Sequence, residues 1–355
     1  MAVFDTTEPQ TAGAGADRAW WERIPAAWWA LLALLVVLPA FANDFVLFQV
    51  MGWTFILGMI ALSLMFLAGY GGMVSLIQMS VAALAGYMVA IFGTSGMAEL
   101  SMGLPWWVYI PVAIVIAAIF GTIVGALAVR TEGIYTIMIT LAIASAFFYF
   151  TRQNYAIFNG YSGFNLVVPP QLFGVDWRQP VPFYYLTGAM ALVCYLAVIY
   201  VSRAPFGLVL QGIRDNPRRM AALGYNVTAH RIAAYTFASV IAALGGILLV
   251  WQNAQIAPGT AGIPAVIDIL VIAVIGGIGR PIGPFIGALI YVLLRTFSPD
   301  VLTAIGFEGE RFKLLVGLGF LALVFWSPDG VLGMWDRWRA GRARAGDPLT
   351  GKGGQ

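Results

Sequence analysis

Apolar runs of about 20 residues are the feature that most constrains this chain, because a run of that length can cross a bilayer as a helix. The 355-residue sequence is 61% hydrophobic and only 10% charged, unlike a soluble domain. Ten such runs are predicted, at roughly 26–42, 47–68, 73–92, 107–128, 133–151, 182–201, 231–251, 264–279, 282–298 and 312–328. The sequence therefore predicts an all-α polytopic membrane protein with about ten transmembrane helices.

The basic residues predict how these helices are oriented. With the N-terminus placed inside, most of the nineteen lysines and arginines fall in cytoplasmic segments, as the positive-inside rule requires. Both termini are then cytoplasmic. We expect a disordered cytoplasmic tail over 1–25, a transmembrane domain over 26–328 and a basic cytoplasmic tail over 329–355. The largest cytoplasmic loop covers about 202–230.

Several functions are disfavoured by what the sequence lacks. A single histidine, His230, excludes a metal site built from a histidine cluster, and a single cysteine, Cys194, excludes an intrachain disulfide. No GxxxxGK[ST] motif occurs, so the chain is not expected to hydrolyse ATP itself. Its positive charge serves membrane orientation rather than nucleic-acid binding. We expect no enzyme activity, no metal and no cofactor in this chain.

The stretch FGLVLQGIRDNPRRMAALGYN, residues 206–226, is a charged interruption between two apolar spans. Its apolar residues fall on one face of a short helix: Phe206, Val209, Leu210 and Ile213. Asn216 and Pro217 suit the N-cap and first position of a second short helix, which Gly224 ends in a left-handed conformation. Two roles fit this pattern: a positive loop lying on the anionic leaflet, or a rigid helical element that docks on a partner protein.

Four sequence blocks resemble, in order and spacing, the branched-chain amino acid permease family of ABC importers. They are GYGGMVSLIQMSVAALAGYMVA, RTEGIYTIMITLAIA, SRAPFGLVLQGIRDNPRRMAALGYN and AVIDILVIAVIGGIGRPIGPFIGALI, within about residues 45–328. The second block is more similar to the LivM-type subunit than to its LivH-type sister. The resemblance implies a bacterial inner-membrane subunit that pairs with a LivH-type sister, sits on two cytoplasmic ATP-binding subunits and receives substrate from an extracytoplasmic binding protein. ATP and magnesium would then be bound by the partner subunits.

In that family the loop corresponding to residues 206–226 is the coupling helix, which contacts the ATPase. The resemblance carries this role over to Phe206, Gly207, Arg214, Asp215, Asn216, Ala221, Ala222, Leu223 and Gly224. Three pairs depart from the family pattern: Gln211-Gly212, Arg218-Arg219 and Ile77-Gln78. The first two departures are expected to affect pairing with the ATPase, and the third leaves the identity of the substrate open.

Polar residues within or beside the spans are the candidates for the translocation path or a gate. They are Ser75, Gln78, Thr136, Thr140, Asn159, Gly160 and Asp268. Structural roles stay open, because Ser and Thr in membrane helices also bond their own backbone and Asp268 can join two helices. Glycine turns are expected at Gly69, Gly71, Gly72, Gly276, Gly277 and Gly279. Such turns are typical of broken or re-entrant helices, whose non-helical backbone must be buried in protein.

These observations predict the transmembrane permease subunit of an ATP-binding-cassette importer, which forms the path for branched-chain or other apolar amino acids. A permease for urea, short amides or aromatic acids is the nearest alternative. An ion-coupled secondary transporter is a second alternative, weakened because only Asp268 supplies a charge near mid-membrane.

Overall fold

The computed structural model describes residues 35–97, 99–131, 133–170 and 176–304, together with residues 317, 330, 331 and 333. The chain divides into two units, Met1–Asp44 and Phe45–Gln355, and each is described by itself. The described part of the first unit includes a 3-10 turn, η2 (Leu38–Ala40). All the elements below belong to the second unit.

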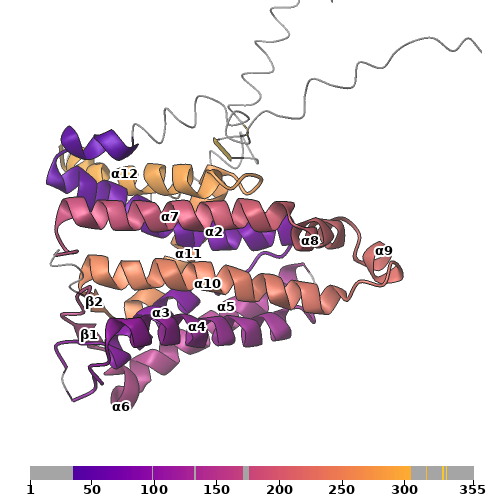
Figure 1. Ribbon diagram of the computed structural model, residues 1–355, viewed down its shortest axis with the longest axis horizontal. Helices are drawn as coiled ribbons and strands as arrows, with labels where there is room; N and C mark the ends of the chain where they lie inside the picture. Colours follow the sequence, from indigo (N-terminus) through magenta and orange to yellow (C-terminus); the bar gives the residue numbers. More distant parts are fainter. Residues whose placement is uncertain are drawn as a thin grey trace, which may run out of the picture. The chain divides into compact units, whose positions relative to one another are not determined.

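Eight of the predicted spans coincide with helices of the second unit (Figure 1). Five helices are long and apolar enough to cross a membrane: Val46–Tyr70, which joins η3 (Val46–Gly52), α2 (Trp53–Met65) and η4 (Phe66–Tyr70), then α4 (Trp106–Ala128), α5 (Ile134–Gln153), α7 (Pro180–Arg203) and α10 (Val227–Asn253). Three shorter apolar helices accompany them: α3 (Gln78–Phe92), α11 (Ile263–Gly276) and the first part of α12 (Gly283–Ala304). The predicted spans 26–42 and 312–328 lie largely outside the described residues, so the count of ten stays a prediction.

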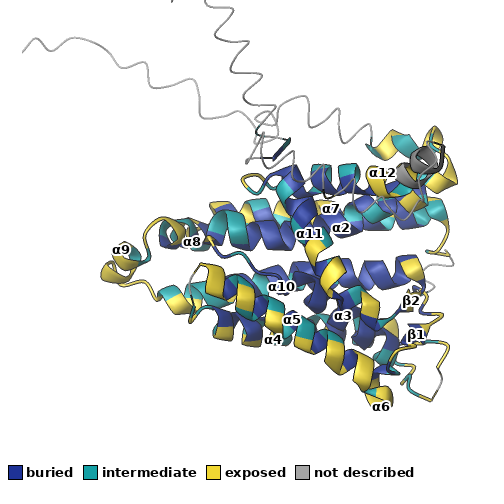
Figure 2. Cartoon of the chain, turned by 180° about the vertical axis from the view of Figure 1, so that it is seen from behind, coloured by how far each residue is buried: buried dark blue, intermediate teal, exposed yellow. Residues whose placement is uncertain are grey.

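The long helices differ in how much of their apolar surface the protein covers. The most apolar stretch is 83% buried in Val46–Tyr70 and 67% buried in α10, but only 28% buried in α4, α5 and α7. The first two helices therefore form the centre of the unit. The other three expose apolar residues, and the exposed positions of α4 and α5 are yellow in Figure 2; helices do this when they face lipid or another membrane subunit.

Small residues allow the central helices to approach one another closely. A Cβ at Gly246 of α10 would overlap the backbone of Ala82 on α3, and a Cβ at Gly121 of α4 would overlap Ser239 of α10. Backbone approach through small residues is typical of membrane helices, because lipid is as apolar as the helix surfaces and burial alone gives little driving force.

Two interruptions place non-helical backbone inside the second unit. The first break (residues 72–77) separates η4 from α3, and the second break (residues 277–282) separates α11 from α12. In the first break Leu76 is buried, and its N–H donates a hydrogen bond to Thr140 Oγ1 on α5 at 3.1 Å. A Cβ at Gly69 would lie 2.5 Å from the carbonyl oxygen of Ile278, so the end of η4 lies against the second break. Burial of the first break agrees with the expectation for a broken helix.

The predicted glycine turns have distinct local environments. Gly72 and Gly277 have φ angles of +66° and +102°, in the region that favours glycine. Gly276 leaves room for the backbone of Gly283 at the start of α12, where a side chain would overlap. Around Gly279 no described atom lies within 4 Å of where a Cβ would be.

The two ends of the second unit carry different structures (Figure 1). One end carries α8 (Pro205–Asp215) and α9 (Pro217–Ala222). The opposite end carries α6 (Tyr155–Phe158) and an antiparallel ladder, in which β1 (Phe164–Asn165) pairs with β2 (Gln255–Ile256), followed by η5 (Pro258–Ala261). The all-α prediction did not anticipate this ladder, because two residues per strand give no alternating pattern to recognise.

Candidate functional site

The α8–α9 pair (residues 205–222) is held to the rest of the unit by the predicted apolar face of α8. Leu210 and Ile213 on this face are buried, and Phe206 and Val209 are half-buried. The spacing of these residues places them on one side of the helix. The charged residues of α8 follow at its C-terminal end. The helical face predicted from the sequence is therefore confirmed.

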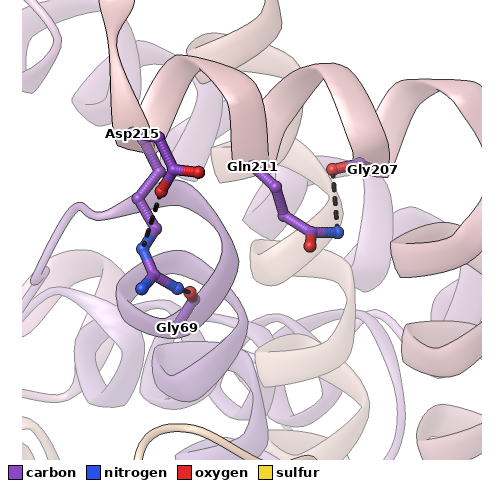
Figure 3. Close-up of polar contacts among 5 residues, drawn as sticks. Gly69, Gly207, Gln211 and Asp215 are labelled. Carbon is purple, nitrogen blue, oxygen red and sulfur yellow. Dashed lines mark hydrogen bonds and ion pairs between the residues drawn. The ribbon is translucent and has the colours of Figure 1, made fainter.

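Two further contacts fix the corner between α7 and α8. Gly207 lies so close to the backbone of Ser202 that any side chain would overlap it. The side-chain amide of Gln211 donates hydrogen bonds to the carbonyl oxygens of Ser202 at 3.0 Å and Gly207 at 3.2 Å, the second of which is drawn in Figure 3. The departure from the family pattern at Gln211 therefore makes contacts within this chain.

α9 has the predicted caps and an uncovered surface. Asn216 Oδ1 accepts the N–H of Arg219 at 3.0 Å, Pro217 takes the first helical position, and Gly224 has a φ of +91°. No residue of α9 is buried (Figure 2), and Asp215, Ala221 and Ala222 are exposed. Leu223, just beyond α9, is 67% exposed. The pair thus ends in a rigid tip with an uncovered apolar side chain.

The side chain of Arg214, at the end of α8, is directed at the first break. Its Nη1 donates a hydrogen bond to the carbonyl oxygen of Gly69 (Figure 3). Its Cγ lies 2.9 Å from the place that a Cβ at Gly72 would take. Its Nε is also 3.9 Å from Asp215 Oδ1, but both side chains are more than half exposed, so this ion pair is weak.

The carbonyl of Gly69 is free to accept this bond because the helix ends beside it. In a continuous α-helix its partner would be the N–H of Met73, but that N–H donates to the carbonyl of Leu67 at 3.0 Å. Carbonyl groups left over at a helix end need another donor where water is excluded. Arg214, 145 residues away in sequence, supplies one.

His230 supports the α8–α9 pair, although the sequence analysis gave it no role there. Its ring stacks on Phe206 with centroids 5.7 Å apart and meets Tyr225 edge-on at 6.0 Å. Its Nδ1 lies 2.9 Å from the carbonyl oxygen of Asn226, whose side chain accepts the N–H of Ala229 and caps α10. In the sequence, the four-residue spacing between Asn226 and His230 is the only feature that indicates this contact.

Polar candidates for the path form contacts inside the bundle. The hydroxyl of Ser63 on α2 donates to Gln78 Oε1 at 3.1 Å, and the Gln78 amide nitrogen has no hydrogen-bond partner among the described residues. Thr140 accepts the N–H of Leu76 and donates to the carbonyl of Thr136 at 2.9 Å. Ser75, the residue before Leu76 in the first break, is also buried.

The other candidates lie elsewhere. Asn159 and Gly160 form a tight turn at the end of the unit opposite α9, where Asn159 Nδ2 donates to the carbonyl of Gly163 at 2.6 Å. Asp268 on α11 accepts a hydrogen bond from the hydroxyl of Tyr291 on α12. The seven path candidates are therefore not gathered at one place, and Asp268 contacts a neighbouring helix of its own chain.

Known proteins were compared with this sequence. Residues 46–324 match the family model described as a branched-chain amino acid transport system / permease component. The chain is 24% identical to the LivM permease protein of Salmonella typhimurium over 65% of this chain and 58% of the relative. It is 25% identical to a probable LivM protein of Methanocaldococcus jannaschii over 62% of this chain and 67% of the relative. It is also 23% identical to the ribose import permease protein RbsC of Haemophilus influenzae over 75% of this chain and 82% of the relative.

The chain spans 58% of the length of the Salmonella typhimurium LivM protein that it matches. No solved structure matches it. These relatives are named as transport permeases and not as enzymes. The family match covers most of the chain and includes both breaks and the α8–α9 pair. This multi-pass helical protein therefore belongs to the family of branched-chain amino acid transport system permease components.

Proposed function

We propose that the chain is the transmembrane subunit of an ATP-driven importer, and that it forms the path for branched-chain or other apolar amino acids. Its partners would be a LivH-type sister permease, two cytoplasmic ATP-binding subunits and an extracytoplasmic binding protein. The LivM relatives support this proposal, because they are named as branched-chain amino acid transport permeases. The outward-facing apolar surfaces of α4, α5 and α7 are suited to lipid and a sister subunit.

The contact between Arg214 and Gly69 is the observation that carries this proposal. The α8–α9 pair has an uncovered tip around Leu223 and, on its inner side, a charged hydrogen bond to the start of the first break. A partner that moves the tip would therefore act on the end of η4, directly before the first break, where the carbonyl of Gly69 has no helical hydrogen bond. Such a link is what an importer needs if ATP is hydrolysed outside the membrane.

The proposed orientation is the one that the distribution of lysines and arginines predicts. The α8–α9 end faces the cytoplasm, where the ATP-binding subunits dock on α9 and Leu223. The opposite end, with the turn at Asn159 and Gly160 and the β1–β2 ladder, then faces the binding protein. Both chain termini would be cytoplasmic.

The test uses the chain assembled with its partner subunits in lipid vesicles, with ATP-driven uptake of L-leucine and ATP hydrolysis measured together. Leu223→Ser should reduce recovery of the ATP-binding subunits with the permease, because it removes the apolar tip. Leu208→Ser is the matched control, since Leu208 is also exposed, at 60%, but lies on α8 outside the tip. Arg214→Gln should preserve assembly and ATP hydrolysis while lowering uptake per ATP. Uptake driven by an ion gradient without ATP would refute the importer assignment.

A further inference from the structure

A cleft of about 280 Å³ lies at the α9 end of the second unit, at the lower end of the range for small-molecule sites. Three parts of the chain form its walls: the first break, the turn between α4 and α5, and the segment around the α8–α9 pair. The lining residues are Gly72, Met73, Val74, Thr131, Gly133, Thr136, Ile137, Pro217 and Arg231. The lining of the cleft is thus mostly apolar, with a few polar groups. The cleft lies between the first break and the α8–α9 pair.

Arg231 provides the positive charge of the cleft. The side chain is half-buried, and its Nε is buried without a hydrogen-bond partner among the described residues. The described residues also place no carboxylate within ion-pair distance of it. A buried guanidinium N–H without an acceptor is unfavourable, and the planar fork of Arg matches the two oxygens of a carboxylate. The enclosed Nε is out of reach of a ligand oxygen, but no carboxylate of the described residues offsets the charge of Arg231, so an anionic ligand group in the cleft would pair with its terminal guanidinium nitrogens.

The two threonines of the cleft have the opposite character. Thr131 Oγ1 donates to the carbonyl of Ala128 at 2.8 Å, and Thr136 Oγ1 donates to the carbonyl of Thr131 at 2.9 Å; the two hydroxyl oxygens also lie 3.3 Å apart, within hydrogen-bond distance of each other. A hydroxyl has one proton and two lone pairs, so each oxygen can only accept from a ligand once its proton is used in this way. The threonine oxygens are therefore acceptors suited to an N–H donor such as an ammonium group.

We propose that this cleft binds a zwitterionic α-amino acid on its way out to the cytoplasm. Arg231 binds the carboxylate, Thr131 and Thr136 accept from the ammonium group, and the side chain lies against Met73 and Ile137. A sugar carries no carboxylate and would leave the charge of Arg231 without a counter-ion. The inference rests on the proposed function. It predicts a ligand of the kind named for the LivM relative and not of the kind named for the ribose import permease relative.

The location of the cleft connects ligand release to the position of the α8–α9 pair. Pro217 starts α9, and Gly72 contacts the side chain of Arg214, so both walls belong to the segments that link the tip to the first break. A shift of the α8–α9 pair relative to the first break changes the width of the cleft. Ligand release is then coupled to the tip through the cleft walls themselves.

The test measures the thermal stabilisation of the purified, nucleotide-free permease assembly by five probes at millimolar concentration. These are L-leucine, L-leucinamide, 4-methylpentanoate, D-ribose and inorganic phosphate. L-leucine should stabilise the wild type, and Arg231→Gln should weaken its binding at least tenfold. Arg231→Lys should recover part of the affinity, because it restores the charge without the planar fork. Arg130→Gln is the matched control, since Arg130 is an exposed arginine on the neighbouring turn that does not line the cleft.

Stronger stabilisation by L-leucine than by either single-charge analogue supports the site, because each analogue lacks one of the two charges. Equal affinity of Arg231→Gln and Arg130→Gln for L-leucine overturns it. Stabilisation by D-ribose in place of L-leucine, equal stabilisation by inorganic phosphate, or no stabilisation by any probe also overturns it. ATP-driven uptake in vesicles reports separately on the proposed function, because uptake that survives in Arg231→Gln unchanged rejects only the cleft.

Discussion

Replacing Gly72 by alanine is expected to lower the uptake of L-leucine per ATP hydrolysed as well as the stability of the protein. Gly72 has a φ of +66°, and the added methyl group would lie 2.9 Å from Cγ of Arg214. An alanine in this backbone conformation costs about 1–2 kcal/mol whatever surrounds it. The contact is with a flexible side chain, so Arg214 is expected to move away rather than hold its place.

Displacing Arg214 removes the hydrogen bond to the carbonyl of Gly69, which has no helical partner. A hydrogen bond to a charged group contributes about 1.5–3 kcal/mol, and we take the lower end because the Arg214 side chain is 51% exposed. The free energy of unfolding of Gly72→Ala should therefore fall by about 3 kcal/mol in total. The assays are thermal unfolding of the assembly in detergent and uptake of L-leucine per ATP hydrolysed.

Gly103→Ala is the matched control for this change. Gly103 has nearly the same φ, +64°, but no atom of the described residues lies within 4 Å of the added methyl group. It should lose only the backbone cost, about 1–2 kcal/mol, and keep normal coupling. The reasoning is refuted if the two variants show the same uptake per ATP, or if Gly72→Ala is no less stable than Gly103→Ala.

Three further changes test other parts of the structure. Asn216→Ala removes the cap of α9 and should cost about 1 kcal/mol locally, seen as faster amide hydrogen exchange in α9 with the bundle unchanged. Gly246→Ala should destabilise the bundle by about 1–3 kcal/mol through overpacking, whereas Gly188→Ala, whose methyl group meets its neighbour at an ordinary 3.4 Å, should be neutral or stabilising by thermal unfolding. Tyr291→Phe removes the hydroxyl that bonds Asp268 and should lower stability by about 1–3 kcal/mol; an unchanged unfolding temperature would exclude a structural role for this contact.

Local features of the fold were predictable from the sequence because their causes are local. Eight of the ten apolar runs coincide with described helices, and the residues Asn216, Pro217 and Gly224 predicted a short capped helix. Each of these depends on a few neighbouring residues: on length and hydrophobicity for a span, and on one side-chain oxygen for a cap. The same holds for the break after Gly72, where glycines mark the end of a helix.

Contacts between distant segments could not be predicted in the same way. The polar residues Gln78, Thr140 and Asp268 were identified individually, but nothing in their spacing indicated Ser63, Leu76 or Tyr291 as their partners. Helix packing in a membrane protein depends on which small residues face each other, and one sequence shows the small residues without their pairing. The candidates therefore proved to lie at separate places.

Arg214 shows where sequence reasoning reaches its limit. A helix that ends just before Gly72 leaves carbonyl groups of its last turn without helical partners, and this need can be inferred from the glycine turn alone. The sequence contains several arginines that could donate to this carbonyl, and Arg218 and Arg219 lie within five residues of Arg214. Only the packing of α8 selects Arg214, because the buried face of Leu210 and Ile213 fixes which side of the helix meets the first break. An arginine that the sequence assigns to a docking surface thus donates to the backbone of the membrane domain, and because it contacts both segments, we expect it to transmit movement of the tip to the first break.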